Sequence, residues 1–320
     1  MVVNSLARTV TTTVAAPGRI IAKRKAAKRN PSLGLDPETD YAQIYRNVTL
    51  YEFPWDMNQA LSFALFRTYA VPSIGDLLDR TGQFCDFTQK RYDDTSLLLE
   101  APLVDGFDSP TGKTAVRRIN QMHKMYDISN EDMLYVLSTF VVVPKRWLDD
   151  YGWRALTESE VRASVRYYQD LGKHMAIKDV PASYDDFATL MDSYEQSHFA
   201  YNDGARRVAD STLHLMTTFY PRPARRGVEL FSRALMDEPL LNAFGYRDPG
   251  ATIRTLSVNA LRLRARLLSV LPSRTEPMHI HDMPNIKSYP SGYDLAEMGT
   301  FPTGCPVPHT APNSAGQAAG

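Results

Sequence analysis

The sequence predicts an all-α fold arranged as a single globular domain. Apolar residues recur with the 3.6-residue spacing of amphipathic helices from about Asp40 to Leu271, and alternating patterns of strand length are scarce. Helix-capping residues precede several of these periodic stretches. Neither an internal repeat nor a central linker divides the 320 residues. We therefore expect one domain rather than two.

The first clear helix is expected to begin near Thr114 and to carry an imidazole on its apolar face. Its inner stripe consists of Val116, Ile119, His123 and Tyr126. An imidazole in such a place either satisfies its nitrogens with polar partners or binds a metal ion. Helix geometry alone favours a structural histidine, because buried polar groups usually find partners within the protein.

A second helix is expected to open at Ser129, with Asp132 three residues later as a variant of the capping box. Its apolar run extends from Met133 to Val143, and we expect Pro144 to end it. Because this helix is apolar nearly all round, it should lie at the centre of the domain.

Further helices follow in the second half of the chain. One is expected to begin at Thr157, where Glu160 completes a capping box, and to end near Gly172. Ser183 then opens a longer helical region that continues to about Tyr220. Two more helical stretches are expected over residues 228–244 and 253–271.

The two ends of the chain differ from the middle in composition. We expect a basic flexible segment over residues 1–35, the helical domain over 36–272, and a Pro/Gly-rich, mostly extended or disordered tail over 273–320. The first 30 residues hold seven Lys or Arg and no acid. Since the chain has 36 basic and 36 acidic residues, the rest of it carries a net charge of −7. An acidic folded part argues against nucleic-acid binding, whereas the basic N-terminus is suited to peripheral contact with a membrane.

Localisation follows from two absences in the sequence. No run of about 18 apolar residues occurs, so we expect no transmembrane segment. Cys85 and Cys305 are the two cysteines, and they lie too far apart in the sequence for a disulfide framework or a CxxC metal site. A reducing compartment is the default for such a chain. We expect a cytoplasmic protein, with membrane contact through the basic N-terminus as an alternative.

Three motifs suggest chemistry that their context does not support. Residues 106–114, GFDSPTGKT, resemble a phosphate loop, but Phe107 stands where the first glycine is required. Glu195 and His198 form a Glu-x-x-His unit like those of helical di-iron sites, which need two such units on helices, whereas the other Glu-x-x-His of this chain, Glu276 to His279, lies in the Pro/Gly-rich tail. His279 and His281 form a His-x-His pair in the tail, where companion ligands for zinc are too few, and we expect them to be solvated.

Residues 117–154 contain an Arg118-x-Asn120-x-x-His123 element and resemble the MpaB-like oxygenases, the family that includes the rubber oxygenases. Other pieces of the sequence agree with this family in the same order, over about residues 36–293. They are Glu52-Phe-Pro-Trp55, Phe63 to Tyr69, Arg91-Tyr-Asp-Asp-Thr95, Asn130 to Tyr135, Trp153-Arg154, Tyr194-Glu195 with Asn202, and Tyr289-Pro-Ser-Gly-Tyr293.

The resemblance implies an all-helical fold that holds haem b. It also implies a haem-dependent oxygenase that uses dioxygen on a lipophilic substrate such as an isoprenoid, by oxidative cleavage of a C=C bond or a related oxygenation. Carried over by position, His123 is the haem-iron ligand. Arg118 is then a cofactor-binding and catalytic candidate that reaches a haem propionate only from the flank, because it lies about 140° around the helix from His123. Asn120 lies nearly above His123. Arg91 is a further propionate candidate.

The sequence departs from the family in one respect. Rubber oxygenases take an axial histidine from the helix that follows the Arg-x-x-x-x-His element. In this sequence the corresponding residues, 134–140, contain no histidine. This argues against rubber cleavage and brings the chain closer to the MpaB branch. Ligation could instead come from His174, His198 or His214. Two other classes of function stay open, namely a helical binding protein for an apolar ligand without redox chemistry, and a peripheral membrane or interaction protein.

Overall fold

The computed structural model describes residues 30–300, and within them the fold is all-helical with no β-strand, which confirms the predicted class. The expected flexible N-terminal segment falls mainly on residues 1–29, and the far end of the tail on 301–320; both lie outside the described residues.

The helical elements are, in chain order, α2 (Tyr41–Arg46), the π-helix η1 (Asn47–Glu52), α3 (Pro54–Tyr69), α4 (Pro72–Arg80), α5 (Gln83–Asp86), α6 (Thr88–Asp105), α7 (Pro110–His123), α8 (Asn130–Tyr151), α9 (Glu158–His174), α10 (Tyr184–His198), α11 (Asp203–Thr218), η2 (Arg222–Ala224), α12 (Arg225–Ala234), α13 (Glu238–Ala243), α14 (Ala251–Val270), η3 (Ile280–Asp282) and η4 (Leu295–Glu297).

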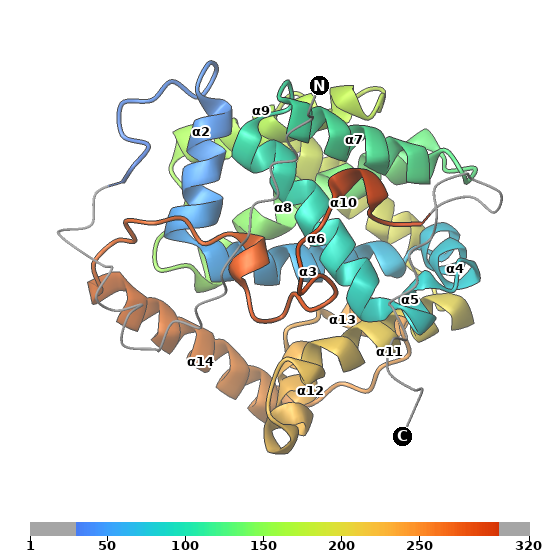
Figure 1. Cartoon of the computed structure of the whole chain (residues 1–320). Helices are drawn as coiled ribbons and strands as arrows, with labels where there is room; N and C mark the ends of the chain where they lie inside the picture. The colour runs from blue at the N-terminus through green and yellow to red at the C-terminus, as the bar shows by residue number, and fades with distance from the viewer. Residues whose placement is uncertain (1–29, 301–320) are drawn as a thin grey trace, which may run out of the picture.

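Helix α8 lies at the centre of the domain, as its nearly uniform apolar character predicts (Figure 1). It packs against α3, α9, α10 and α14. Tyr135, Val142 and Leu148 of α8 are almost completely buried. The surrounding helices each turn one apolar side toward it, so that a single large core forms from residues far apart in the sequence.

The prediction that Pro144 ends this helix is wrong, because α8 continues through it to Tyr151. A proline inside a helix removes one backbone hydrogen bond and costs about 3 kcal/mol. Trp147 and Leu148, in the turn after the proline, are buried in the core. Their burial offsets that loss and holds the last turns in helical form.

The caps predicted at Ser129 and Thr157 are confirmed, but the capping box expected at Ser129 is only half formed, because the Asp132 carboxylate accepts from other hydroxyls. The Ser129 hydroxyl accepts from the Asp132 N–H at 3.0 Å at the start of α8. At the start of α9, Thr157 and Glu160 form a reciprocal capping box. Each arrangement satisfies a backbone donor that the first turn of a helix leaves unpaired.

Three helix boundaries differ from the prediction because of caps that the periodicity did not reveal. Helix α7 begins at Pro110 rather than near Thr114, since Ser109 accepts from the Gly112 N–H at 2.9 Å. The stretch over 183–220 is two helices, because extended residues end α10 and Asn202 caps α11. The stretch over 228–244 is likewise divided into α12 and α13, with Asp237 capping α13.

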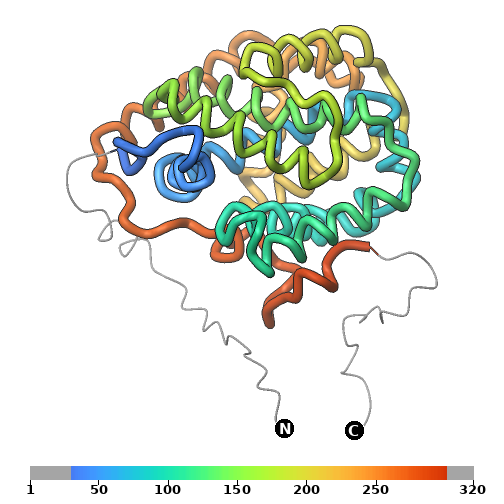
Figure 2. Tube along the Cα trace, turned by 90° about the horizontal axis from the view of Figure 1, so that it is seen from above, coloured from blue at the N-terminus to red at the C-terminus, as the bar shows by residue number. Residues whose placement is uncertain are grey.

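The segment over residues 273–300 is mostly extended, but it is held against α6 and α7 rather than disordered (Figure 2). Asp93, buried on α6, accepts hydrogen bonds from the N–H groups of residues 287 and 288. Asp94 accepts from the Gly299 N–H at 3.1 Å and from the Tyr289 hydroxyl. Met298 is fully buried in a small apolar cluster with residues of α6 and α7. This part of the predicted tail therefore belongs to the folded domain.

Candidate functional site

A cavity of about 300 Å³ lies inside the helical domain. Ligand pockets in proteins measure about 300–1,000 Å³ and are lined mainly by apolar side chains with a few polar groups. This cavity has that character, and its apolar lining includes Leu65, Ile74, Leu77 and Leu78 of α3 and α4, Leu98 and Leu99 of α6, Ile119 and Met122 of α7, Met133, Val136, Leu137 and Phe140 of α8, and Leu215 and Met216 of α11.

His123 lines this cavity as the last residue of α7. The helix is fixed at its start by the Ser109 cap and by Pro110 in its first turn. Val116 and Ile119, on the same face as His123, are buried. The apolar stripe that the sequence predicts for this helix thus directs the imidazole into the interior.

The imidazole of His123 is neutral and only partly satisfied. Its Nδ1 atom is buried and has no hydrogen-bond partner within residues 30–300. Burial, and to a lesser degree the positive charge of Arg91, lower the pKa of His123 to about 4. At neutral pH the ring therefore keeps a lone pair that it can donate to a metal.

Arg91 lines the same cavity from α6. Its guanidinium lies over the Phe84 ring, 5.4 Å from the centroid, and makes no ion pair in the part of the chain that the structure describes. Burial lowers the pKa of Arg91, and Asp94 acts in the opposite direction. The cavity wall therefore holds a guanidinium without a direct ion pair beside a neutral imidazole, and this guanidinium can donate to an anionic ligand group.

Two further polar residues of the cavity wall, Tyr69 and Asp132, were not predicted as site residues from the sequence. Tyr69 ends α3, and burial raises its pKa to about 12, so its hydroxyl stays protonated. Asp132 accepts hydrogen bonds from the hydroxyls of Ser73 and Tyr194, both at 2.9 Å. Tyr69 belongs to one of the pieces of sequence that resemble the family, and this resemblance could have indicated it as a site residue.

Arg118 and Asn120 lie on α7 but are not in the cavity wall. Arg118 is buried, and its guanidinium donates to the carbonyl of Met298 at 2.6 Å and to that of Thr300. Asn120 donates from Nδ2 to the carbonyl of His174 at 2.9 Å. Both side chains therefore hold neighbouring backbone segments. Thr300 itself lines the cavity, so Arg118 acts on the wall indirectly.

The three alternative histidine ligands do not reach the cavity either. His198 is exposed, stacks on Tyr194 and contacts the Tyr194 carbonyl through Nδ1 at 2.9 Å. His214 is exposed on α11. His174 stacks on Phe107, with 5.0 Å between the ring centroids. His123 is therefore the one histidine of residues 30–300 in this wall.

Glu195, the partner of His198 in the Glu-x-x-His motif, has a structural role. Its carboxylate is buried and binds the guanidinium of Arg67, with the Tyr135 hydroxyl donating at 3.1 Å. Glu195 and His198 also differ sharply in exposure. The phosphate-loop look-alike is equally explained, because its Ser109 and Pro110 begin α7. Neither motif forms the site that its pattern resembles.

The expectation that His279 and His281 are simply solvated is wrong. The buried carboxylate of Glu100 lies between them, 3.3 Å from Nδ1 of His279 and 3.7 Å from Nδ1 of His281. The companion group comes from α6, far away in the sequence, so a search for nearby ligands could not identify it.

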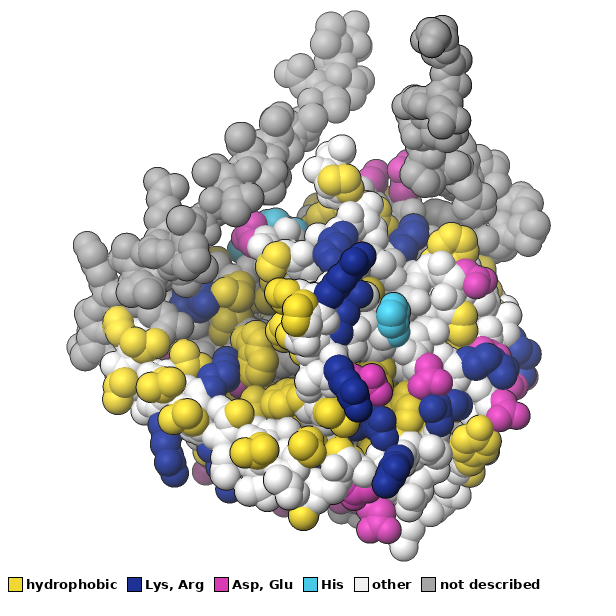
Figure 3. Space-filling model, turned by 90° about the horizontal axis from the view of Figure 1, so that it is seen from below, with side chains coloured by type: hydrophobic (Ala, Val, Ile, Leu, Met, Phe, Trp, Pro, Cys, Tyr) yellow, Lys and Arg dark blue, Asp and Glu magenta, His cyan; other side chains and the backbone are white. Residues whose placement is uncertain are grey.

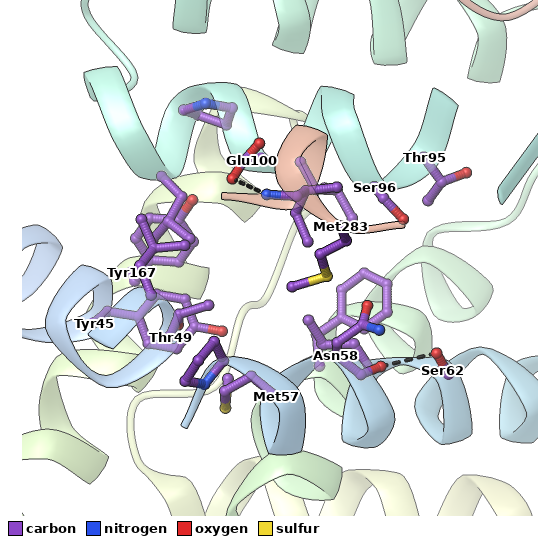
Figure 4. A pocket seen from close by; sticks show the side chains of 18 of the residues that line it. Tyr45, Thr49, Met57, Asn58, Ser62, Thr95, Ser96, Glu100, Tyr167 and Met283 are labelled. Atoms are coloured by element: carbon purple, nitrogen blue, oxygen red, sulfur yellow. Dashed lines mark hydrogen bonds between the residues drawn. The ribbon is translucent and has the colours of Figure 1, made fainter. Parts of the chain in front are cut away.

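A smaller pocket of about 100 Å³ adjoins the cavity and shares part of its wall, including Leu65, Thr95, Ser96 and Phe140. Figure 4 shows this pocket, with Met57 and Asn58 of α3 on one side and Met283 of the C-terminal segment among the lining side chains. Glu100 lies at its edge, where it accepts a hydrogen bond from the Ile280 N–H at 2.6 Å. The two spaces therefore share a mainly apolar wall.

A comparison with known protein families identifies the family of this chain. The profile described as "ER-bound oxygenase mpaB/B'/Rubber oxygenase, catalytic domain" matches residues 57–268, about two thirds of the chain. The chain belongs to this MpaB/rubber oxygenase family. His123 and Arg91, with the helices that carry them, lie inside the matched region, whereas His279 and His281 lie beyond it.

Individual relatives in the MpaB/rubber oxygenase family come from fungi. The chain is 29% identical over 227 residues to the ER-bound oxygenase mpaB' of Penicillium brevicompactum, covering 64% of this chain and 53% of that protein. It is 30% identical to mpaB of the same organism, over 62% and 55% of the two chains. For mpaB of Penicillium roqueforti the identity is 30%, over 64% and 74%. The chain thus spans about half the length of the first two relatives.

Proposed function

We propose that this protein is a haem-dependent oxygenase that acts on a lipophilic, isoprenoid-like substrate. The observation that carries the proposal is the buried, unpartnered Nδ1 of His123 in the wall of an apolar cavity. Buried polar atoms without a partner are rare in folded proteins and call for an explanation such as an ion or ligand. The family to which the chain belongs is described as an oxygenase family and supports the same reading.

The residues of the cavity fit haem b in three respects. His123 would supply a neutral nitrogen to the iron, because its pKa is held near 4. Arg91, which makes no direct ion pair within residues 30–300, would donate to a propionate. The leucine, isoleucine and methionine side chains would cover the macrocycle and keep water away. When bound, haem would supply the chemistry of dioxygen activation.

We assign the other predicted residues supporting tasks. Arg118 would keep residues 298–300 in place over the cavity, and Asn120 would tie the end of α9 to α7. Tyr69, protonated at working pH, would offer a hydrogen-bond donor inside the cavity. A lipophilic substrate would extend from the cavity into the adjoining pocket, because the two share a wall.

The proposal is tested by the colour and metal content of the protein. Chain purified from haem-sufficient cells should show a Soret band and one iron per polypeptide. It should also consume dioxygen when a reductant and a prenylated substrate are supplied. Preparations that contain no iron and do not take up added haem would contradict the proposal and favour a helical carrier of apolar ligands instead.

We further propose that the protein attaches to anionic membrane surfaces through α14. Leu256, Leu263, Leu267 and Val270 are 57–80% exposed, and their spacing places them along one side of this helix. The opposite side, with Leu261 and Ala265, is buried against the domain. Such an outward apolar stripe is typical of helices that lie in a lipid interface.

Charge identifies the partner of this stripe as an anionic lipid surface. The sequence of α14 contains four arginines and no acid. Arg254 and Arg264 pair with Asp248 and Asp56, whereas Arg262 and Arg266 are exposed and have no ion pair among residues 30–300. In Figure 3, apolar side chains gather beside basic ones on the underside, where α14 lies in Figure 1. A second copy of α14 would bring like charges together, while acidic lipids attract them.

Two facts accompany this proposal. The relatives are named ER-bound. No helix in residues 30–300 has the length and apolar character needed to cross a bilayer. Attachment through an amphipathic helix that lies on the surface does not require a membrane-spanning helix. The seven basic residues among the first 30 would strengthen it.

A further inference from the structure

The cluster of Glu100, His279 and His281 lies where the C-terminal segment crosses α6, outside the wall of the large cavity. The two histidines flank Ile280 at the start of the short helix η3. Their rings are stacked, with 5.1 Å between the centroids, and both Nδ1 atoms face the same carboxylate. One donor atom from each of the three residues lies within 4.8 Å of the other two.

The charge of Glu100 needs a counterion that the protein does not fully provide. Its side chain is 5% exposed, and no Lys or Arg in the described residues forms an ion pair with it. A buried carboxylate is costly unless a positive charge compensates it. The groups that face it are two imidazoles and the Ile280 N–H. Asp282 adds a further negative charge beside His281.

His281 has a carboxylate beside each of its two ring nitrogens, as metal-binding histidines often do. Its Nε2 atom lies 3.6 Å from an Asp282 carboxylate oxygen, while Nδ1 faces Glu100. Histidines that bind metals usually donate their other ring N–H to a carboxylate, which fixes the tautomer and makes the ligand more basic. Asp282 is therefore placed to orient His281 for an ion held at Nδ1.

We propose that Glu100, His279 and His281 bind one divalent transition-metal ion of the zinc class. With metal–ligand bonds of about 2.0–2.2 Å, donor atoms in a tetrahedral site lie roughly 3.3–3.6 Å apart. The two carboxylate–imidazole distances are close to this spacing: Nδ1 of His279 lies 3.3 Å from Oε1 of Glu100, and Nδ1 of His281 lies 3.7 Å from Oε2. Two imidazoles and one carboxylate leave the fourth position to water.

The ion would act as a cross-link between the C-terminal segment and α6. Met278, Ile280 and Met283 of that segment line the smaller pocket, and Glu100 lies at its edge. Holding residues 279–281 on α6 therefore keeps this wall closed. The site is separate from His123, and it does not depend on the proposed haem chemistry.

The test is zinc binding by the full-length chain without a histidine tag, after dialysis against a chelator and then against buffer. Elemental analysis separates zinc from haem iron, and calorimetry gives the affinity. We expect one zinc ion per chain at micromolar or tighter affinity, and a higher unfolding temperature when zinc is added. Asp282→Asn should weaken binding by about tenfold to a hundredfold.

Variants of the ligands decide between a metal site and a plain ion pair. Glu100→Gln and the double variant His279→Ala/His281→Ala should abolish the stoichiometric zinc and the thermal shift. The matched control His198→Ala/His214→Ala removes two exposed histidines and should change neither. Circular dichroism establishes that each variant is folded. Zinc binding of equal affinity in the double variant, or no binding by the wild-type chain at micromolar zinc, would overturn the proposal.

Discussion

His123 and Arg91 enter the same cavity from two different helices, and the charge of Arg91 adds to burial in keeping the His123 imidazole neutral. This pairing brings a lone pair and a cation to one apolar space. A group that combines a metal with carboxylates would satisfy both.

The low pKa of His123 makes the stability of the haem-free protein depend on pH. The folded pKa of about 4 is below the ordinary 6.5, so the unfolded chain binds more protons between these values. Stability is therefore complete above pH 6.5 and is lost as the pH falls toward 4, by up to about 1.4 kcal/mol per pH unit. Urea unfolding at a series of pH values should show this slope, and His123→Leu should reduce it. Equal slopes in the two proteins would rule out a buried neutral imidazole.

Arg91→Met should loosen the haem without removing it. The variant loses a charge-assisted hydrogen bond of about 1.5–3 kcal/mol, which corresponds to haem loss roughly ten to a hundred times faster. Transfer of haem to an excess of apomyoglobin measures this rate. Arg80→Met is a matched control, because Arg80 also borders the cavity but is 64% exposed and pairs with Asp76. If both variants lose haem at the wild-type rate, Arg91 does not contact a propionate.

Arg118→Leu should destabilise the C-terminal segment while leaving the Soret maximum in place. Its guanidinium binds the carbonyls of residues 298 and 300, and hydrogen bonds from a charged donor contribute about 1.5–3 kcal/mol each. Limited proteolysis should cut this segment faster than in the control Arg117→Leu, which alters an exposed neighbour. Haem loss as fast as in Arg91→Met, with unchanged proteolysis, would instead support direct contact with the cofactor.

Much of the scaffold could be predicted from the sequence because caps and helical periodicity are local. Ser129, Thr157 and the inward face of α7 follow from neighbouring residues alone. The continuation of α8 through Pro144 could not be predicted, because the turn beyond this proline is buried by other helices.

The roles of the predicted site residues depended on partners far along the chain. The carbonyls that bind Arg118 belong to residues 298 and 300, and the carboxylate between the tail histidines belongs to α6, so in both cases about 180 residues separate the partners. The family-like pieces are explained by such contacts as well. Arg154 binds Glu52, and Tyr289 binds Asp94, so pieces distant in sequence meet in space.

Leu263→Gln/Leu267→Gln should abolish binding to vesicles that contain phosphatidylserine. The two leucines are more than half exposed, so the substitutions should not affect folding. Flotation with phosphatidylcholine vesicles, with and without phosphatidylserine, measures the effect, and high salt should weaken binding by the wild-type chain. Ala251→Gln, at the exposed start of the helix, is the control. Undiminished binding by the double variant would show that α14 is not the attachment surface.

The most direct test of the central claim is the absorption spectrum and iron content of His123→Ala beside the wild-type chain. We predict a Soret band and one iron per chain in the wild type, and a shifted or absent band in His123→Ala, because the nitrogen that would bind the iron is gone. His174→Ala, His198→Ala and His214→Ala should keep the wild-type spectrum. An unchanged spectrum and iron content in His123→Ala would contradict the account.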